Sequence, residues 1–599
     1  MQTPFHPSLR EVLSQPIGER GRATKAADVE RVRSAASGSS SWAFRSRQSA
    51  VQALLPLALA LQACSGAPVR GTLSLDDQQT APPALLASRT IQPAEIRGAV
   101  RLLSSDAFEG RGVGSRGDTV TRAYIAAEFE RLGLSVMGDD GSFTQSVPIL
   151  GLTTTIESQL VATGKAGEAR MQAPADYTAV AGSPAAQARW QDAEIVFCGY
   201  GIKAEAQQWD DWKEQDVRGK VVLVMNDDPS SDPSLFAGTT RLYYGRWTYK
   251  FEEAARRGAV GVLLIHTNQS AGYPFHVQQA SHGRENFWLP FRDGEPTLPI
   301  RSWIAEDKAR QLCALGGLDL DALRAVAQTR DFRPVPLGVQ VSLAASTKTR
   351  ELRSGNVLGM LKGSDPSRAH ETIVVTAHFD HLGIGTEKRG DSIYNGALDN
   401  ATGIAALLAI ARICSEMNPR PARSILFSAV TAEESGLLGS QWLARNLPID
   451  RKTTIANFNI DGLGIWGETS DIEIVGFGKN SLTQVAERIG LAMGLRVRPD
   501  SNPDLGLFYR SDHFNFARIG VPAAYFKSGS DFKDRPDDRK RMKASYTATH
   551  YHQPSDEVAD WWNFEAAAKD AQFVLECLLA CSQGDAPTWT RGDEFEALR

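Results

Sequence analysis

Three short, uninterrupted apolar runs in the second half of the chain constrain its fold most. They are Ile373–Ala377, Ser424–Val430 and Thr454–Ile460. Runs of this length and composition are typical of strands that are covered on both faces. The segment Ala401–Met417 lies between the first two runs and has apolar residues at helical spacing. Strands that alternate with helices predict an α/β fold with a mixed, mostly parallel sheet flanked by helices.

Residue types that bind metals follow each of these runs directly. In chain order they are His378 and Asp380, then Glu433 and Glu434, then Asp461. Because the carboxyl ends of parallel strands meet at one edge of a sheet, we expect these side chains to lie close together. Two further candidates are Asp399, which stands just before the predicted helix, and His552, which stands in a polar loop.

Two histidines and three carboxylates can hold a pair of zinc ions when one carboxylate bridges them. Glu433 is then spare and can take a proton from metal-bound water. Each residue alone has an ordinary structural explanation: a packed histidine, a solvated pair of glutamates, or Asp399 as a helix N-cap. The hypothesis of a zinc site rests on their combination at successive ends of one sheet.

The local motifs around these residues resemble the M28 family of zinc exopeptidases. They are His378-x-Asp380, Gly396-Ala-x-Asp399-Asn, Glu433-Glu434-x-Gly436-Leu-Leu-Gly439-Ser440, Asn459-x-Asp461 and His552. The resemblance covers residues 91–150 and 345–585, which would form the catalytic domain, and leaves 586–599 as a tail. It implies a peptide hydrolase, a zinc-dependent metallo-aminopeptidase, with two zinc ions per chain and peptide substrates.

The resemblance also implies a role for each residue. One zinc would be held by His378, Asp399 and Asp461. The other would be held by Asp399, Glu434 and His552, with Asp399 as the bridge. Glu433 would be the general base, and Asp380 would accept the proton of the His378 ring. A cis peptide bond is expected at Asp399–Asn400.

The loop from Phe508 to Asn515 resembles the substrate-side loop of the family, which makes Tyr509, Arg510 and Asp512 candidate substrate-binding residues. The alternative is a packed loop that caps the following helix. Zinc chemistry alone does not decide which peptide end is held, so a carboxypeptidase or dipeptidase is the closest alternative activity. Arg510 would suit that alternative, and a catalytically inactive binding protein is a third hypothesis.

Residues 151–335 are strand-rich and resemble a protease-associated (PA) domain inserted into the catalytic domain. The resemblance is carried by Asp216-Val-Arg-Gly-Lys-Val-Val-Leu-Val and by Ala254-Ala-Arg-Arg-Gly-Ala-Val-Gly-Val-Leu-Leu. Between these motifs, Tyr249–Arg257 predicts a helix. Further along, the doubly charged run Asp531–Lys543 predicts an exposed loop.

The N-terminal part of the chain predicts export. Residues 1–64 end in an apolar run with a basic flank and with Leu61-Gln62-Ala63-Cys64, which resembles a bacterial lipobox. Lipidation of Cys64 would give a periplasmic or outer-membrane-anchored lipoprotein. The chain would contact the membrane only through the lipid on Cys64, with residues 65–90 as a tether. The alternative is a buried helix of a longer N-terminal domain. With 65 Lys and Arg against 70 Asp and Glu, the net charge of −5 disfavours nucleic acid as a partner.

Overall fold

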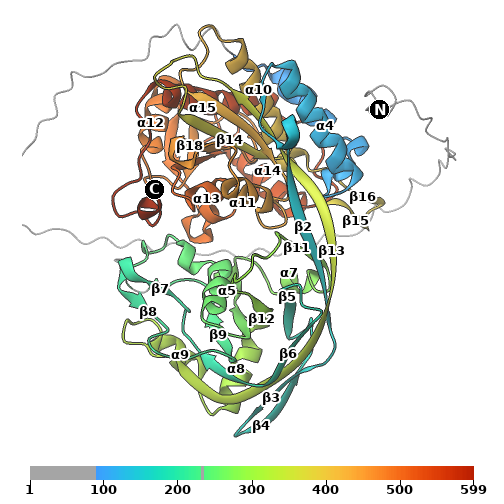
Figure 1. Ribbon diagram of the computed structural model, residues 1–599, viewed down its shortest axis with the longest axis vertical. Helices are drawn as coiled ribbons and strands as arrows, with labels where there is room; N and C mark the ends of the chain where they lie inside the picture. The colour runs from blue at the N-terminus through green and yellow to red at the C-terminus, as the bar shows by residue number, and fades with distance from the viewer. Residues whose placement is uncertain (1–89, 231, 233–234) are drawn as a thin grey trace, which may run out of the picture. The chain divides into compact units, whose positions relative to one another are not determined.

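A computed structural model of the chain describes residues 90–230, 232 and 235–599 (Figure 1). The predicted export segment with Cys64, and the tether except for its last residue, lie outside the described residues. Within the described part, seventeen strands join into one continuous sheet, and two short two-stranded sheets stand apart from it.

The sheet that carries the candidate site is built around four parallel strands. In spatial order they are β17 (Ser424–Val430), β14 (Thr372–His378), β18 (Thr454–Asn459) and β21 (Ala523–Ser528). The sheet is extended by antiparallel β13 (Val335–Leu361) beside β17, and by β19 (Asp471–Val475) with β20 (Arg496–Pro499) beyond β21. The predicted mixed, mostly parallel sheet is confirmed, and the strand ends differ from the predicted runs by one residue at most.

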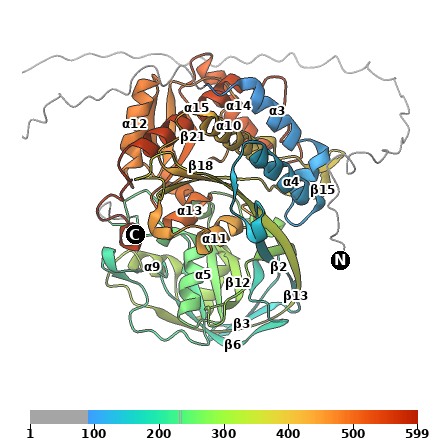
Figure 2. The ribbon, with the colours of Figure 1, turned by 45° about the horizontal axis from the view of Figure 1, so that its top comes forward.

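Helices cover both faces of this sheet (Figure 2). Alternate residues of β14 show why: Ile373 and Val375 belong to one buried cluster, and Val374 belongs to another. The first cluster includes residues of α3 (Pro93–Leu103), α4 (Arg116–Arg131), α10 (Thr402–Glu416), α12 (Leu482–Ala492) and α15 (Phe564–Gln583). The second includes residues of α11 (Leu438–Arg445) and α13 (His513–Ala517). Continuous apolar strands are therefore required, because neither face meets water.

Helix α10 is buried along most of its length. Together with the turn before it, from Ala397 to Glu416, it is long and apolar enough to cross a membrane, and most of that stretch is buried inside the protein. Its apolar composition is accounted for by its position in the core, between the sheet and α3 and α15.

The strand-rich segment forms its own α/β layer. Strands β6 (Gln187–Phe197), β9 (Val221–Met225), β10 (Gly261–His266) and β12 (Leu298–Ala305) run parallel, and β5 (Tyr177–Gly182) pairs antiparallel with β12. Helices α5 (Trp247–Arg256), α8 (Glu306–Leu315) and α9 (Leu320–Val326) accompany them, and β3 (Leu160–Gly164) and β4 (Gly167–Met171) form a hairpin. The strand–helix–strand unit β9–α5–β10 lies where the sequence predicts it.

A long two-stranded ribbon connects this layer to the sheet that carries the candidate site, called the catalytic sheet below. Strand β2 (Thr144–Ile156) pairs antiparallel with β13 in unbroken register from Thr144↔Val357 to Ile156↔Ala345. Figure 1 shows the two strands running side by side from one group of elements to the other. The predicted boundaries at 151 and 345 fall inside these strands, so no separate linker joins the two parts.

The remaining elements are short or lie at the rim. They are β1 (Ser135–Val136), β7 (Lys203–Ala204), β8 (Trp209–Asp210), α6 (Asn268–Ala271), α7 (His276–Ala280), β11 (Glu285–Trp288), β15 (Gly383–Lys388), β16 (Asp391–Tyr394) and α14 (Pro536–Thr549). Helix α14 corrects the prediction of an exposed loop at 531–543. Pro536 occupies its first turn and Asp537 and Asp538 follow, an arrangement that favours helix initiation.

Candidate metal centre

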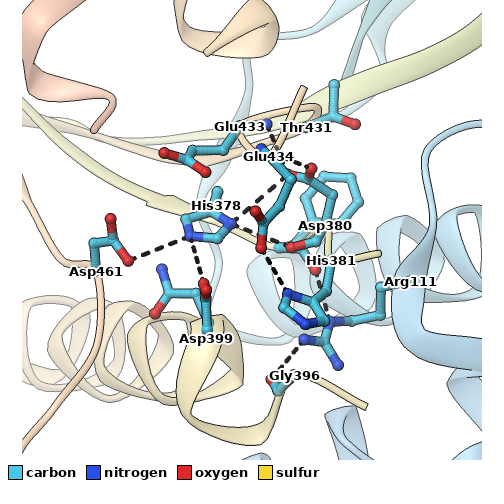
Figure 3. A network of polar contacts seen from close by, with 12 residues as sticks. Arg111, His378, Asp380, His381, Gly396, Asp399, Thr431, Glu433, Glu434 and Asp461 are labelled. Carbon is cyan, nitrogen blue, oxygen red and sulfur yellow. Dashed lines mark hydrogen bonds and ion pairs between the residues drawn. The ribbon is translucent and has the colours of Figure 1, made fainter. Parts of the chain in front are cut away.

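The predicted metal-binding side chains meet at one edge of the sheet (Figure 3). His378 is the last residue of β14, Glu434 lies four residues beyond β17, and Asp461 lies two residues beyond β18. Asp399 lies in the turn that leads into α10, and His552 lies just after α14. Residues spread over 175 positions of the chain are thus brought together because three parallel strands end side by side.

The first group of donors is formed by His378, Asp399 and Asp461. The Nε2 atom of His378 lies 3.3 Å from Oδ1 of Asp399 and 3.3 Å from Oδ1 of Asp461. Two ligand atoms about 2.0–2.1 Å from a tetrahedral zinc ion are about 3.3 Å apart. The three side chains therefore have the spacing of ligands that share one zinc ion.

The second group uses the other oxygen of Asp399. His552 Nε2 lies 3.2 Å from Asp399 Oδ2 and 3.0 Å from Glu434 Oε2. Because the two oxygens of Asp399 face different groups of donors, this carboxylate lies between two candidate metal positions. This is the geometry that a bridging ligand requires.

His381 also belongs to this region, although sequence reasoning placed it outside the ligand set. Its Nδ1 atom lies 2.7 Å from Glu434 Oε1, and it groups with Asp399 and Glu434 as a candidate metal-binding set. The 2.7 Å separation is shorter than the roughly 3.3 Å expected for two ligands of one tetrahedral zinc. The distances therefore favour His552 as the ligand and His381 as a neighbour of the other Glu434 oxygen.

Several buried atoms in the cluster have no hydrogen-bond partner among the described residues. They are both ring nitrogens of His381, Nε2 of His552 and Oε1 of Glu434. The close contacts of His381 Nδ1 and His552 Nε2 with carboxylate oxygens are ion pairs that do not count as hydrogen bonds. Buried polar atoms are costly when they stay unsatisfied, and a metal ion satisfies such converging lone pairs. The donors present, imidazole nitrogens and carboxylate oxygens, are those that zinc binds, so the residues fit this metal.

The electrostatics of the cluster favour a cation. Burial alone would raise the pKa values of Asp399 and Glu434, but the neighbouring histidines outweigh it. They hold the pKa of Asp399 well below its usual value and lower that of Glu434 to about 2. Burial alone would lower the pKa of His552, and the carboxylates of Glu434 and Asp399 raise it to about 10. Carboxylates outnumber histidines here, so the site attracts positive charge.

Asp380 forms contacts in addition to the predicted one with the His378 ring. His378 Nδ1 lies 3.2 Å from the main-chain oxygen of Asp380 but 3.8 Å from its carboxylate. The carboxylate instead accepts hydrogen bonds from the main-chain N–H groups of Glu433, at 3.0 Å, and Glu434, at 3.4 Å. Burial raises its pKa to about 8. Asp380 therefore positions the turn that carries both glutamates, and the His378 ring is oriented by a main-chain oxygen.

Comparison with known proteins agrees with this geometry. The model of peptidase family M28 matches residues 356–575, which include every candidate metal ligand. Residues 356–575 are therefore similar to a peptidase family M28 domain. The cis peptide bond expected at Asp399–Asn400 is present.

Curated relatives are similar to the M28 domain over part of their length. Aminopeptidase NAALADL1 of Mus musculus is 28% identical over 183 residues, covering 28% of this chain and 23% of the relative. Leupeptin-inactivating enzyme 1 of Streptomyces exfoliatus is 26% identical over 178 residues, covering 30% of this chain and 36% of the relative. A probable zinc metalloprotease of Pyricularia oryzae is 34% identical over 155 residues, covering 25% and 27%. The chain thus spans about a quarter to a third of these relatives.

Solved structures are similar over more of the chain. An aminopeptidase from Aneurinibacillus sp. strain AM-1 is 21% identical, covers 82% of this chain and 94% of its own, and has a TM-score of 0.47. BSAP, a zinc aminopeptidase from Bacillus subtilis, is 19% identical, covers 85% and 99%, and has a TM-score of 0.41.

Arg111 supports the M28 domain from outside the matched residues. Its buried guanidinium donates from Nε to the main-chain oxygen of Phe379, at 2.7 Å, and from Nη2 to that of Gly396, also at 2.7 Å. It also donates from Nη1 to the main-chain oxygens of Leu103 and Asn395. One side chain thus holds the loop after His378 against the turn before Asp399.

Two further side chains fix the main chain around Asp399. Asn400 Oδ1 accepts hydrogen bonds from the N–H groups of Gly403 and Gly462, and its Nδ2 donates to the oxygen of Ile460. Asp556 Oδ2 accepts from the N–H of Asp399 at 3.2 Å. The turn that carries the bridging carboxylate is therefore tied to the loop after β18 and to the loop after His552.

The loop 508–515 reaches the M28 site mainly through a residue that was not predicted. Ser511 Oγ donates to Asp461 Oδ2 at 2.6 Å and accepts from Asn459 Nδ2 at 2.7 Å, which fixes the Asp461 carboxylate. Its two partners lie 50 and 52 positions away in the chain, so the local sequence carries no signal for this role.

The three predicted substrate residues of this loop have different environments. The Tyr509 ring is buried and its hydroxyl donates to Glu594 Oε1 at 2.5 Å, so this side chain serves packing. Asp512 is fully buried, and burial raises its pKa to about 6. Arg510 is exposed. Of the three, Arg510 is the one that solvent and ligands can reach.

Glu433 stands beside the metal ligands without joining either group. In Figure 3 its carboxylate points away from Glu434, on the side of the site where Asp461 lies, and no contact is drawn to it. Burial raises its pKa well above the usual value, and the carboxylates of Asp461 and Glu434 add to this shift. A carboxylate with raised proton affinity beside a metal site is suited to general base catalysis.

Proposed function

We propose that this chain is a zinc-dependent exopeptidase that hydrolyses N-terminal residues from peptides, with Glu433 as the general base. The observation that supports it is the position of Asp399, whose two oxygens face two groups of donors with the spacing of zinc ligands. The M28 domain and the named aminopeptidases among the relatives agree with a peptide hydrolase.

A pair of zinc ions bound here would supply Lewis acid chemistry, which polarises the scissile carbonyl and lowers the pKa of water. His378, Asp399 and Asp461 would hold one ion, and Asp399, Glu434 and His552 the other. Ser511 keeps Asp461 in place, and Asp380 fixes the turn of Glu433 and Glu434, so the ligands need little rearrangement to bind metal.

Glu433 performs the proton transfers in this proposal. Its carboxylate takes a proton from the attacking water and then delivers it to the nitrogen of the leaving amine as the peptide C–N bond breaks. The raised pKa of Glu433 suits both steps, because the group must accept a proton and hold it until the amine leaves.

The alternative is a carboxypeptidase or dipeptidase activity. Arg510 favours it, since an exposed arginine beside the site can hold a carboxylate. One peptide digested in three forms decides between them: free, N-acetylated and C-amidated. The full chain is loaded with zinc, and products are followed by mass spectrometry.

We expect digestion of the free and amidated forms only, which identifies an aminopeptidase. Digestion of the free and acetylated forms only would show a carboxypeptidase. If zinc binds and none of the three forms is digested, the proposed activity is wrong.

Export as a lipoprotein is the second part of the proposal, and it rests on the sequence up to Cys64. Cells fed a labelled fatty acid should incorporate label into the wild-type chain and not into Cys64→Ser. Equal labelling of both would refute lipidation at this residue.

A further inference from the structure

Arg246 is a guanidinium without a counter-ion. It is the N-cap residue of α5, in the segment inserted between β2 and β13. Its Nε atom is buried and has no hydrogen-bond partner among the described residues. The buried Arg111, by contrast, donates four hydrogen bonds.

The charges around Arg246 are positive. Burial, together with the charges of Arg510 and Arg241, lowers its pKa to about 9. Arg241 already has partners, because it donates to the main-chain oxygen of Ser270 at 2.8 Å and pairs with Asp227 at 3.1 Å. Arg510 is exposed and forms no ion pair among the described residues. Arg246 and Arg510 therefore leave two positive charges unmatched in one place.

Packing holds this positive site against the catalytic sheet. The main-chain N–H of Arg241 donates to the oxygen of Pro503 at 3.1 Å. Gly506 packs closely against both side chains, since a Cβ there would lie 3.2 Å from Arg241 Cδ and 3.3 Å from Arg246 Cδ. The Tyr243 ring, three residues before Arg246, packs against Phe514 with ring centroids 5.0 Å apart.

The positive site is also close to the metal ligands along the chain. Arg510 immediately precedes Ser511, whose hydroxyl donates to Asp461 at 2.6 Å. Consecutive Cα atoms are about 3.8 Å apart, and an extended peptide advances about 3.3–3.6 Å per residue. Arg510 therefore lies one residue along the main chain from a side chain that contacts a candidate metal ligand.

We propose that Arg246 and Arg510 bind a carboxylate of the peptide substrate, so that the enzyme prefers peptides with a carboxylate close to the scissile bond. Removing a guanidinium from water without a partner is unfavourable, and a carboxylate can satisfy its planar N–H groups with two parallel hydrogen bonds. The inference rests on the proposed peptidase function. The carboxylate can come from the free C-terminus of a short peptide or from an acidic side chain.

The test compares three substrates that differ only in where a carboxylate lies. They are Leu-Ala-Ala with a free C-terminus, the same peptide as its amide, and Leu-Glu-Ala amide. We expect the full zinc-loaded chain to show kcat/KM at least about tenfold higher for a carboxylate-bearing peptide than for the neutral amide, the contribution of one charge-assisted hydrogen bond. The first and third peptides distinguish a C-terminal from a side-chain carboxylate.

Substitutions assign the preference to the arginines. Arg246→Gln should bring the ratio of carboxylate to amide substrates close to one, Arg510→Gln should lower it, and Arg246→Lys should keep part of it. Arg170→Gln is the matched control, because Arg170 is exposed on β4 and pairs with Glu168. It should leave the ratio unchanged.

A second measurement separates substrate binding from a structural role. Since Nε of Arg246 has no hydrogen bond to lose, the Arg246→Gln variant should melt at the wild-type temperature or above it. A lower melting temperature with an unchanged ratio would overturn the inference, as would a wild-type ratio near one. If the wild-type chain cleaves none of the peptides, the proposed peptidase function is wrong. If it cleaves all three at equal rates, the peptidase function stands and the proposed carboxylate preference is wrong.

Discussion

The guanidinium of Arg111 and the main-chain oxygen of Gly396 lie 2.7 Å apart, although 285 positions separate them in the chain. The hydrogen bond joins the N-terminal helices to the turn that carries Asp399. Residues before the strand-rich segment thus hold the turn that carries a candidate metal ligand.

Replacing Arg111 should therefore damage stability and metal binding together. Arg111→Met would leave four main-chain oxygens without their donor and should lower the free energy of unfolding by about 3 kcal/mol or more. Urea denaturation and metal analysis measure the two effects. Arg116→Met, at a side chain that is 60% exposed, should change stability by less than about 0.5 kcal/mol. Equal stability of the two variants would contradict the structural role.

Glu433 is expected to be needed for turnover but not for metal binding. Glu433→Gln should lower kcat by about 10²–10⁴, the contribution of a general base. Its zinc content should stay at two per chain, because Glu433 belongs to neither ligand group. Steady-state kinetics and elemental analysis check both statements, with Glu128→Gln on α4 as the control. A kcat within tenfold of wild type would exclude Glu433 as the base.

Asp399 should determine how many metal ions are bound. Because each of its oxygens faces a different group of donors, Asp399→Ala should reduce the zinc content below two per chain. Inductively coupled plasma mass spectrometry of the dialysed protein measures it. Asp307→Ala, at an exposed carboxylate of α8, should keep the wild-type content. Two zinc ions bound to Asp399→Ala would refute the bridging role.

The two histidines near Glu434 should behave differently. His552→Ala should lose one zinc ion, because His552 has the spacing of a ligand to both Asp399 and Glu434. His381→Ala should still bind two ions, with affinity reduced about 10- to 100-fold, as expected for a residue that orients a ligand. Zinc titration against a competing chelator separates the cases. The opposite pattern would make His381 the ligand.

His513 should make the protein sensitive to acid. Burial lowers its pKa to about 3 from an ordinary value of 6.5, and both ring nitrogens lack partners among the described residues. Between these pH values the unfolded chain binds a proton that the folded chain does not. Stability from this group is therefore complete above pH 6.5 and decreases as the pH falls toward 3, by at most about 1.4 kcal/mol per unit.

The variant His513→Gln isolates this effect. The difference in unfolding free energy between wild type and variant should shrink as the pH falls from 7.5 to 4.5, since other groups contribute equally to both. Urea denaturation at several pH values measures it. A difference that does not change with pH would show that His513 titrates normally in the folded state.

Local sequence predicted the elements that have a strong apolar pattern. The bounds of β17 agree exactly with the predicted run, and the metal-binding residues follow from the ends of such strands. Side chains that hold ligands in place were not predictable in this way. Ser511 and Asp556 act through partners 50 and 157 positions away, and nothing in their own neighbourhoods indicates those partners.

The long strand β13 was missed for a related reason. Its first half alternates buried and exposed residues from Leu337 to Ala345, a pattern that predicts a strand. Its middle, around Thr347–Arg353, is mostly polar, a composition that predicts a boundary between domains. That stretch is a strand because β2 pairs with it, which is a tertiary effect.

The ribbon of β2 and β13 also limits how the two parts of the protein can move. Thirteen consecutive residue pairs cross from the inserted layer into the catalytic sheet without a break. A flexible linker would act as a free hinge, whereas a paired ribbon resists bending within its plane and yields mainly to torsion. Access to the predicted zinc ligands would then change through a small screw-like rotation of the inserted layer relative to the sheet that carries them. Heating should melt the inserted layer and that sheet in a single transition.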